Sequence, residues 1–145
     1  MNSRRTKIIV DTFMSIFLML SFIRWEGFGG AIYHFVTGGL CAFFFALHIC
    51  IHRKWIKATT KLCFTGKLSK ALRWKYIVDV LLFAVWGISI VTGFITMSPF
   101  LSDMENISPL GRLHGITARF GLALIVIHLI QHIPQIKSYL KIKNK

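Results

Sequence analysis

All six histidines of this 145-residue chain fall into one spacing pattern that occurs twice. The pattern, H-x-x-T-x10-H-x-x-x-H, recurs at an offset of 80 positions and covers two sets of residues: His34, Thr37, His48 and His52, then His114, Thr117, His128 and His132. Neutral imidazole is the commonest metal ligand in proteins. A lone histidine in an apolar segment often serves structure, but a pattern that takes up every histidine indicates a metal or haem site.

The spacing within each copy brings two histidines to one face of a helix. His34 and His48 are fourteen positions apart, which at about 100° per residue is roughly 40° short of four turns and about 21 Å along the axis. The same spacing separates His114 and His128. Helix axes in a bundle lie about 8–10 Å apart, so its diagonal of roughly 11–14 Å has room for two facing side chains and a metalloporphyrin.

Facing imidazoles without a cysteine ligand predict two non-covalent b-type haems used for electron transfer. We expect two ligand pairs, in which each haem takes one histidine from each copy: His34 with His114 for an outer haem, and His48 with His128 for an inner haem. The three cysteines form neither C-x-x-C nor C-x-x-C-H, which argues against covalently attached haem and against an iron–sulfur cluster.

The second histidine of each H-x-x-x-H motif leaves alternatives open. His52 and His132 would hydrogen-bond haem propionates, help at a quinone site or ligate iron directly. The two H-x-x-x-H motifs could instead supply a zinc site, because residues four apart lie on adjacent turns of one helix face. Zinc leaves His34 and His114 unexplained, so it ranks second. A non-redox membrane anchor for a partner subunit is the third hypothesis.

Residues close to the histidines have weaker signals. Gly38 would let a porphyrin approach α-helical backbone closely, or would serve ordinary small-residue helix packing. Thr37 and Thr117, one turn beyond the outer histidines, would bond a backbone carbonyl or orient a ligand. Arg119 lies inside an apolar segment and is expected to pair with a propionate of the outer haem rather than extend to the membrane surface.

The elements that position these residues are membrane helices. Hydrophobic residues make up 54% of the chain and the mean hydropathy is +0.62, which is too apolar for a soluble domain of this size. Four segments are long enough to span the hydrocarbon core, at about 8–23, 31–51, 76–97 and 113–133. We expect the first to be a retained span rather than a cleaved signal peptide, because Asp11 interrupts it and no small-residue cleavage pattern follows.

The charge of the chain, formally +13, indicates topology. Of its 18 basic residues, 15 lie before the first span, in a basic loop over 53–75, or after the last span. The positive-inside rule therefore predicts a multi-pass protein of the cell membrane with both termini cytoplasmic and membrane lipid as its surroundings. The outer side holds nearly balanced charges: Arg24, Glu26, Asp103, Glu105 and Arg112. This distribution argues against a nucleic-acid partner, because no soluble folded surface is available to bind one.

The repeat extends to the spans that lack histidines. K-x-I-V-D begins at Lys7 and again at Lys75, and so places Asp11 and Asp79 at equivalent positions. Helix-dipole stabilisation and pairing with lysine are the favoured roles of these carboxylates, and orientation of an imidazole or transfer of quinol protons is the alternative. The whole chain, 1–145, is expected to be one all-α integral membrane four-helix bundle made of two duplicated helical hairpins.

These motifs resemble a known family. The duplicated hairpins, and the H-x-x-x-H motif followed by "RKWI" from Arg53, are similar to the flavinylation-associated cytochromes, small four-helix b-type cytochromes formerly described as a domain of unknown function. The histidine spacing is more distantly similar to that of cytochrome-b subunits of quinone-linked respiratory enzymes. The second copy departs from the family pattern, because "IPQI" follows His132.

The resemblance implies electron transfer across the bilayer. The donor would be a quinol or a cytosolic reductant, and the acceptor an extracytoplasmic flavoprotein or other redox protein. The resemblance carries haem ligation onto four positions, His34, His48, His114 and His128, and leaves His52 and His132 open. The chain would then act as an electron carrier or as the membrane subunit of an oxidoreductase.

Overall fold

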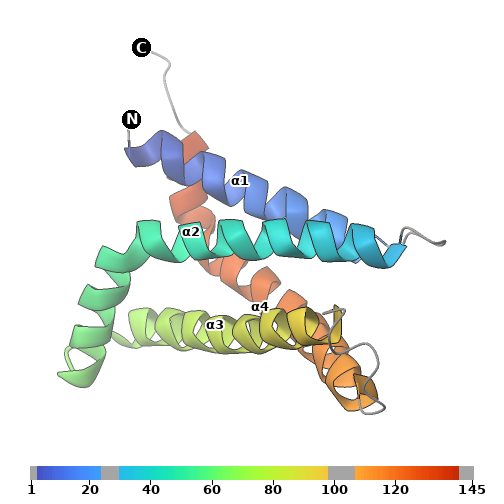
Figure 1. The fold of residues 1–145 in the computed structure, drawn as a ribbon. Coiled ribbons are helices and arrows are strands. Elements are labelled where there is room, and N and C mark those ends of the chain that lie inside the picture. The colour runs from blue at the N-terminus through green and yellow to red at the C-terminus, as the bar shows by residue number, and fades with distance from the viewer. Residues whose placement is uncertain (1–2, 24–29, 98–106, 141–145) are drawn as a thin grey trace. The chain divides into compact units, whose positions relative to one another are not determined.

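The structure, a computed structural model, describes residues 3–23, 30–97 and 107–140. They form four α-helices: α1 (Ser3–Phe22), α2 (Gly30–Phe64), α3 (Lys70–Met97) and α4 (Ile107–Leu140) (Figure 1). No strand occurs in these three ranges, which confirms the predicted all-α fold class. Of the predicted outer charges, Arg24, Glu26, Asp103 and Glu105 lie outside the described residues.

Among the described residues, three helices are long and apolar enough to cross a membrane: α2, α3 and the part of α4 from Pro109 to Ser138. The fourth predicted span, α1, does not meet the same criterion. Its 20 residues include Arg4, Arg5, Lys7 and Asp11 in the first half, so too few uncharged positions remain for a full span. Large apolar side chains are exposed along all four helices, as lipid-facing residues are, for example Met19, Phe43, Phe83 and Ile116.

The helix α2 continues beyond its predicted end at Ile51 to Phe64. Residues 53–64 contain neither glycine nor proline, and lysine, alanine and leucine among them favour helix, so the helix does not stop where the apolar segment does. Gly66 ends it with φ 69°. The amide of Gly66 donates to the carbonyl of Cys63, and that of Lys67 to Leu62, which together form a Schellman cap.

The next helix begins almost at once. The hydroxyl of Ser69 accepts from the amide of Leu72 at 3.3 Å and so caps the first turn of α3. Near the same junction, the hydroxyls of Thr60 and Tyr76 lie 3.0 Å apart, which ties the end of α2 to the start of α3. The segment predicted as a basic loop over 53–75 is therefore mostly helical, and only residues 65–69 join α2 to α3.

The chain divides into two compact units, Met1–Ala58 and Thr59–Lys145. The first contains α1 packed on the larger part of α2, and we call it the first hairpin. The second contains α3 packed on α4, and we call it the second hairpin. These units correspond to the two copies of the sequence repeat, so the predicted pair of helical hairpins is confirmed.

Candidate metal-binding sites

The first hairpin brings together Asp11 of α1 with His48 and His52 of α2. The Nδ1 atom of His48 lies 2.7 Å from a carboxylate oxygen of Asp11. The rings of His48 and His52 have centroids 4.5 Å apart and planes 36° apart. One ligand atom from each residue lies within 4.8 Å of the others, so this first His/Asp group could hold a metal ion.

The second hairpin repeats this arrangement with Asp79 of α3 and His128 and His132 of α4. The Nδ1 atom of His128 lies 2.7 Å from a carboxylate oxygen of Asp79. The two rings have centroids 4.5 Å apart and planes 38° apart. Nε2 of His132 comes within 3.9 Å of the same oxygen of Asp79. This second His/Asp group could also hold a metal ion.

The contacts of Asp11 and Asp79 differ from the role favoured by the sequence, which is helix-dipole stabilisation and pairing with lysine. Each carboxylate is instead bonded to a histidine of the neighbouring helix. The alternative, orientation of an imidazole, is the one that the geometry supports. A signal for it exists in the sequence, because the aspartates recur with the same offset as the rest of their helix and at the depth of the H-x-x-x-H motifs.

The two outer histidines are held by backbone oxygens. Nδ1 of His34 lies 2.8 Å from the carbonyl oxygen of Ser21, and Nδ1 of His114 lies 2.8 Å from that of Ser89. The serines are again 68 positions apart, the offset of the aspartates. Sequence reasoning missed both, because every residue has a carbonyl oxygen and residue type gives no sign of which one accepts.

The carbonyls become available in different ways. Ser21 lies in the last turn of α1, which ends at Phe22, where carbonyls have no amide partner within the helix. Ser89 lies well inside α3, where a carbonyl accepts an amide of its own helix, so a second lone pair serves His114. Gly93 permits the close approach there, because a Cβ at this position would lie 2.9 Å from Cε1 of His114.

All four predicted haem ligands therefore share one property. Nδ1 of each faces an oxygen at 2.7–2.8 Å: the carbonyls of Ser21 and Ser89 or the carboxylates of Asp11 and Asp79. A carbonyl or a carboxylate only accepts, so Nδ1 carries the hydrogen and the lone pair of the neutral ring is on Nε2. Metal-ligating histidines typically donate their other ring N–H to such an acceptor.

The remaining predicted site residues are Thr37, Thr117, Arg119 and Gly38. Within the described ranges, none of them makes a hydrogen bond to an imidazole ring. The hydroxyl of Thr37 donates to the carbonyls of Tyr33 and His34, and that of Thr117 donates likewise within α4, so both take the backbone role. Nε of the exposed Arg119 donates to the carbonyl of Gly115 at 3.0 Å. No heavy atom lies within 4 Å of a Cβ built on Gly38.

The arrangement is that of a membrane protein with two His/Asp groups that could bind metal or support haem ligation. In each hairpin, the imidazoles come from one helix and the carboxylate from the other. A comparison of the chain with known protein families, curated proteins and solved structures finds no match.

Proposed function

We propose that the chain is a membrane di-haem b-type cytochrome that carries electrons across the bilayer. The observation that supports this function best is the shared property of His34, His48, His114 and His128. Each imidazole has its Nδ1 fixed by an oxygen of its own hairpin, which orients the ring and presents Nε2 as a ligand. Four such residues, two in each hairpin, are the number that two bis-histidine haems require.

The donor set fits haem. Iron in b-type cytochromes is held by neutral imidazoles without thiolate, and a bound haem supplies reversible one-electron transfer. His34 with His114 would hold one haem, and His48 with His128 the other. This pairing is based on the sequence repeat, which gives matching histidines the same depth in the membrane.

The two classes of acceptor would give the haems different redox potentials. A carboxylate makes an imidazole a stronger donor than a neutral carbonyl does, and stronger donation favours oxidised iron. Asp11 and Asp79 act on His48 and His128, while Ser21 and Ser89 offer only carbonyls to the outer histidines. The haem held by His48 and His128 should therefore have the lower potential, and electrons should pass from it to the outer haem.

The direction of this gradient agrees with the proposed topology. Basic residues at the start of α1 and around the junction of α2 and α3 favour a cell-membrane protein with cytoplasmic termini. The carboxylate-bonded histidines would then lie toward the cytoplasm. A quinol or cytosolic donor would reduce the inner haem, and the resemblance to flavinylation-associated cytochromes favours an extracytoplasmic flavoprotein as acceptor.

The decisive experiment counts haem and iron in the full chain purified in detergent. We expect two haems per chain, extractable into acidic organic solvent, with a reduced spectrum typical of bis-histidine ligation and two resolved midpoint potentials. Colourless protein after expression with added haem precursor would overturn the proposal.

A second function is favoured by a specific observation: the three ligand atoms of each His/Asp group lie within 4.8 Å of one another. Two imidazoles and a carboxylate can complete a zinc site with one further ligand. The chain would then bind one divalent ion in each hairpin, as a carrier or sensor of metal in the membrane.

Replacement of His48 and His128, singly and together, separates the two functions. If both histidines ligate one haem, either single alanine variant loses that haem and the double variant loses no more. If each hairpin binds its own divalent ion, each single variant loses one ion and the double variant loses both. Metal and haem content per chain, measured on variants of equal helical content, gives the answer.

A further inference from the structure

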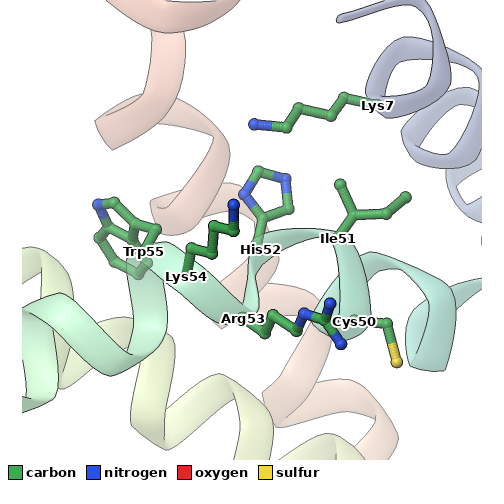
Figure 2. A pocket seen from close by; sticks show the side chains of 7 residues that line it. All are labelled: Lys7, Cys50, Ile51, His52, Arg53, Lys54 and Trp55. Atoms are coloured by element: carbon green, nitrogen blue, oxygen red, sulfur yellow. The ribbon is translucent and has the colours of Figure 1, made fainter. Parts of the chain in front are cut away.

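A basic pocket lies where the start of α1 meets residues 50–55 of α2, a segment that includes His52 of the first His/Asp group. Its volume is about 610 Å³, and residues of both helices line it, including Lys7, Ile51, His52, Arg53, Lys54 and Trp55 (Figure 2). The pocket lies entirely within the first hairpin. It is separate from the bond between His48 and Asp11, neither of which is among its lining residues.

The charged side chains that line the pocket are all positive. Lys7, Arg53 and Lys54 contribute three cations to the lining, and no carboxylate is part of it. Figure 2 shows the amines of Lys7 and Lys54 extending from two different helices toward the imidazole of His52. Within the described ranges, none of the three cations takes part in an ion pair, since the carboxylates of Asp11 and Asp79 are bonded to histidines. An anion would therefore find several donors and no competing acid.

The position of the pocket narrows the choice of anion. It lies where α2 passes from its apolar segment to a basic one, and in the proposed topology this boundary is at the depth of lipid headgroups. Ile51 and Trp55 add an apolar part to the lining, and tryptophan favours this interface. Basic pockets between helices on the cytoplasmic side are typical of anionic lipid binding.

We infer that this pocket binds the phosphate group of an anionic phospholipid headgroup. Lys7, Arg53 and Lys54 supply the positive charge, while Ile51 and Trp55 contact the apolar part of the lipid next to the phosphate. The inference does not depend on the proposed haems, because none of the four proposed haem ligands lines the pocket, although His52 of the first His/Asp group does.

The second hairpin provides an internal contrast. It retains Lys75 at the position equivalent to Lys7, but Ile133, Pro134 and Gln135 stand where the first hairpin has Arg53, Lys54 and Trp55. Two of the three cations and the tryptophan are thus missing from that copy. The first hairpin alone should hold the lipid tightly.

The test uses the full chain reconstituted in equal parts of phosphatidylglycerol and phosphatidylcholine, then extracted in mild detergent. Mass spectrometry counts the lipids retained per chain. We expect phosphatidylglycerol to be enriched, and Lys7→Gln or Lys54→Gln to weaken its retention about fivefold each. Lys75→Gln and Lys57→Gln remove the same charge outside the pocket and should leave retention unchanged.

Each outcome decides the inference. Equal loss in pocket and control variants, or no enrichment in the parent chain, overturns it, because diffuse attraction to the surface would explain the result. Inorganic phosphate added during extraction distinguishes the source of the anion: retained lipid that resists phosphate identifies a lipid site, and lipid that phosphate displaces identifies a site for soluble phosphate groups. Lys54 is exposed, so its variant tests the pocket without disturbing helix packing.

Discussion

The two hairpins make the same polar contacts, although the apolar side chains packed between their helices differ. The bond from histidine to aspartate is 2.7 Å in both, and the bond from the outer histidine to a serine carbonyl is 2.8 Å in both. In the first hairpin, Phe44 of α2 stacks on Phe13 and Phe17 of α1. In the second, a buried Leu124 replaces Phe44, and Trp86 packs against Gly121. Packing is free to change as long as the interior stays filled, so the shared contacts point to ligand orientation rather than to stability.

The hairpins also differ in how closely they enclose their His/Asp groups. The side chain of Asp11 is 41% exposed, whereas that of Asp79 is 18% exposed. Beside the second group, both amide atoms of Gln131 are buried without a hydrogen-bond partner in the described chain, and the first hairpin has the apolar Ile51 at the equivalent position. The carboxylate of Asp79 is therefore the less solvated of the two, while His48 and His128 are similarly exposed, and the bond of Asp79 should be the stronger.

The largest effect should come from the outer histidines, which belong to neither His/Asp group. We expect His34→Ala or His114→Ala to remove one of two haems and leave the other with its potential almost unchanged. The physical reason is that loss of one axial ligand leaves a five-coordinate, weakly held porphyrin. Haem content and redox titration of each variant measure the effect. If both variants kept all bound metal, the divalent-ion function would be favoured instead.

The next effect sharpens the contrast between the two carboxylates. Removal of a carboxylate that orients a ligand typically lowers cofactor affinity about 10–100-fold. The loss of affinity in Asp79→Asn should be near the upper end of this range, because Asp79 is the less exposed and approaches both His128 and His132. The loss in Asp11→Asn should be near the lower end. Competition with a haem-binding apoprotein measures both affinities, and an equal loss in the two variants would show that solvent exposure does not control these bonds.

Much of this fold and part of the site could be predicted from the sequence. Apolar length and the doubled histidine pattern are local signals, so four helices, two hairpins and the candidate ligands followed directly. The helix end at Phe64 could not be predicted, because hydropathy marks where a membrane span could end and not where a helix ends. The choice between lysine and histidine as partner of Asp11 depends on how α1 is rotated against α2, which only packing determines.

Smaller changes should arise from the different packing of the two hairpins. A Cβ at Gly121 would lie 2.8 Å from Nε1 of Trp86, so Gly121→Ala forces that ring to move. We expect it to destabilise the second hairpin by about 1–3 kcal/mol. Gly87→Ala is the matched control in the same hairpin, since nothing lies within 4 Å of its Cβ. Thermal unfolding in detergent compares the two, and an equal transition temperature would contradict the close contact with Trp86.

The smallest effect should come from the serines whose carbonyls hold the outer histidines. Alanine keeps the carbonyl, so Ser21→Ala should remove only the bond from the Ser21 hydroxyl to the carbonyl of Leu18 and should leave haem binding intact. Ser89→Ala also removes a hydroxyl 3.4 Å from Nδ1 of His114, a distance at which a hydrogen bond is weak. Its cost should stay below about 1 kcal/mol. Haem content and the outer midpoint potential test both variants. Loss of haem in Ser89→Ala alone would mean that the hydroxyl, and not the carbonyl, orients His114, and the two outer histidines would then be held by different means.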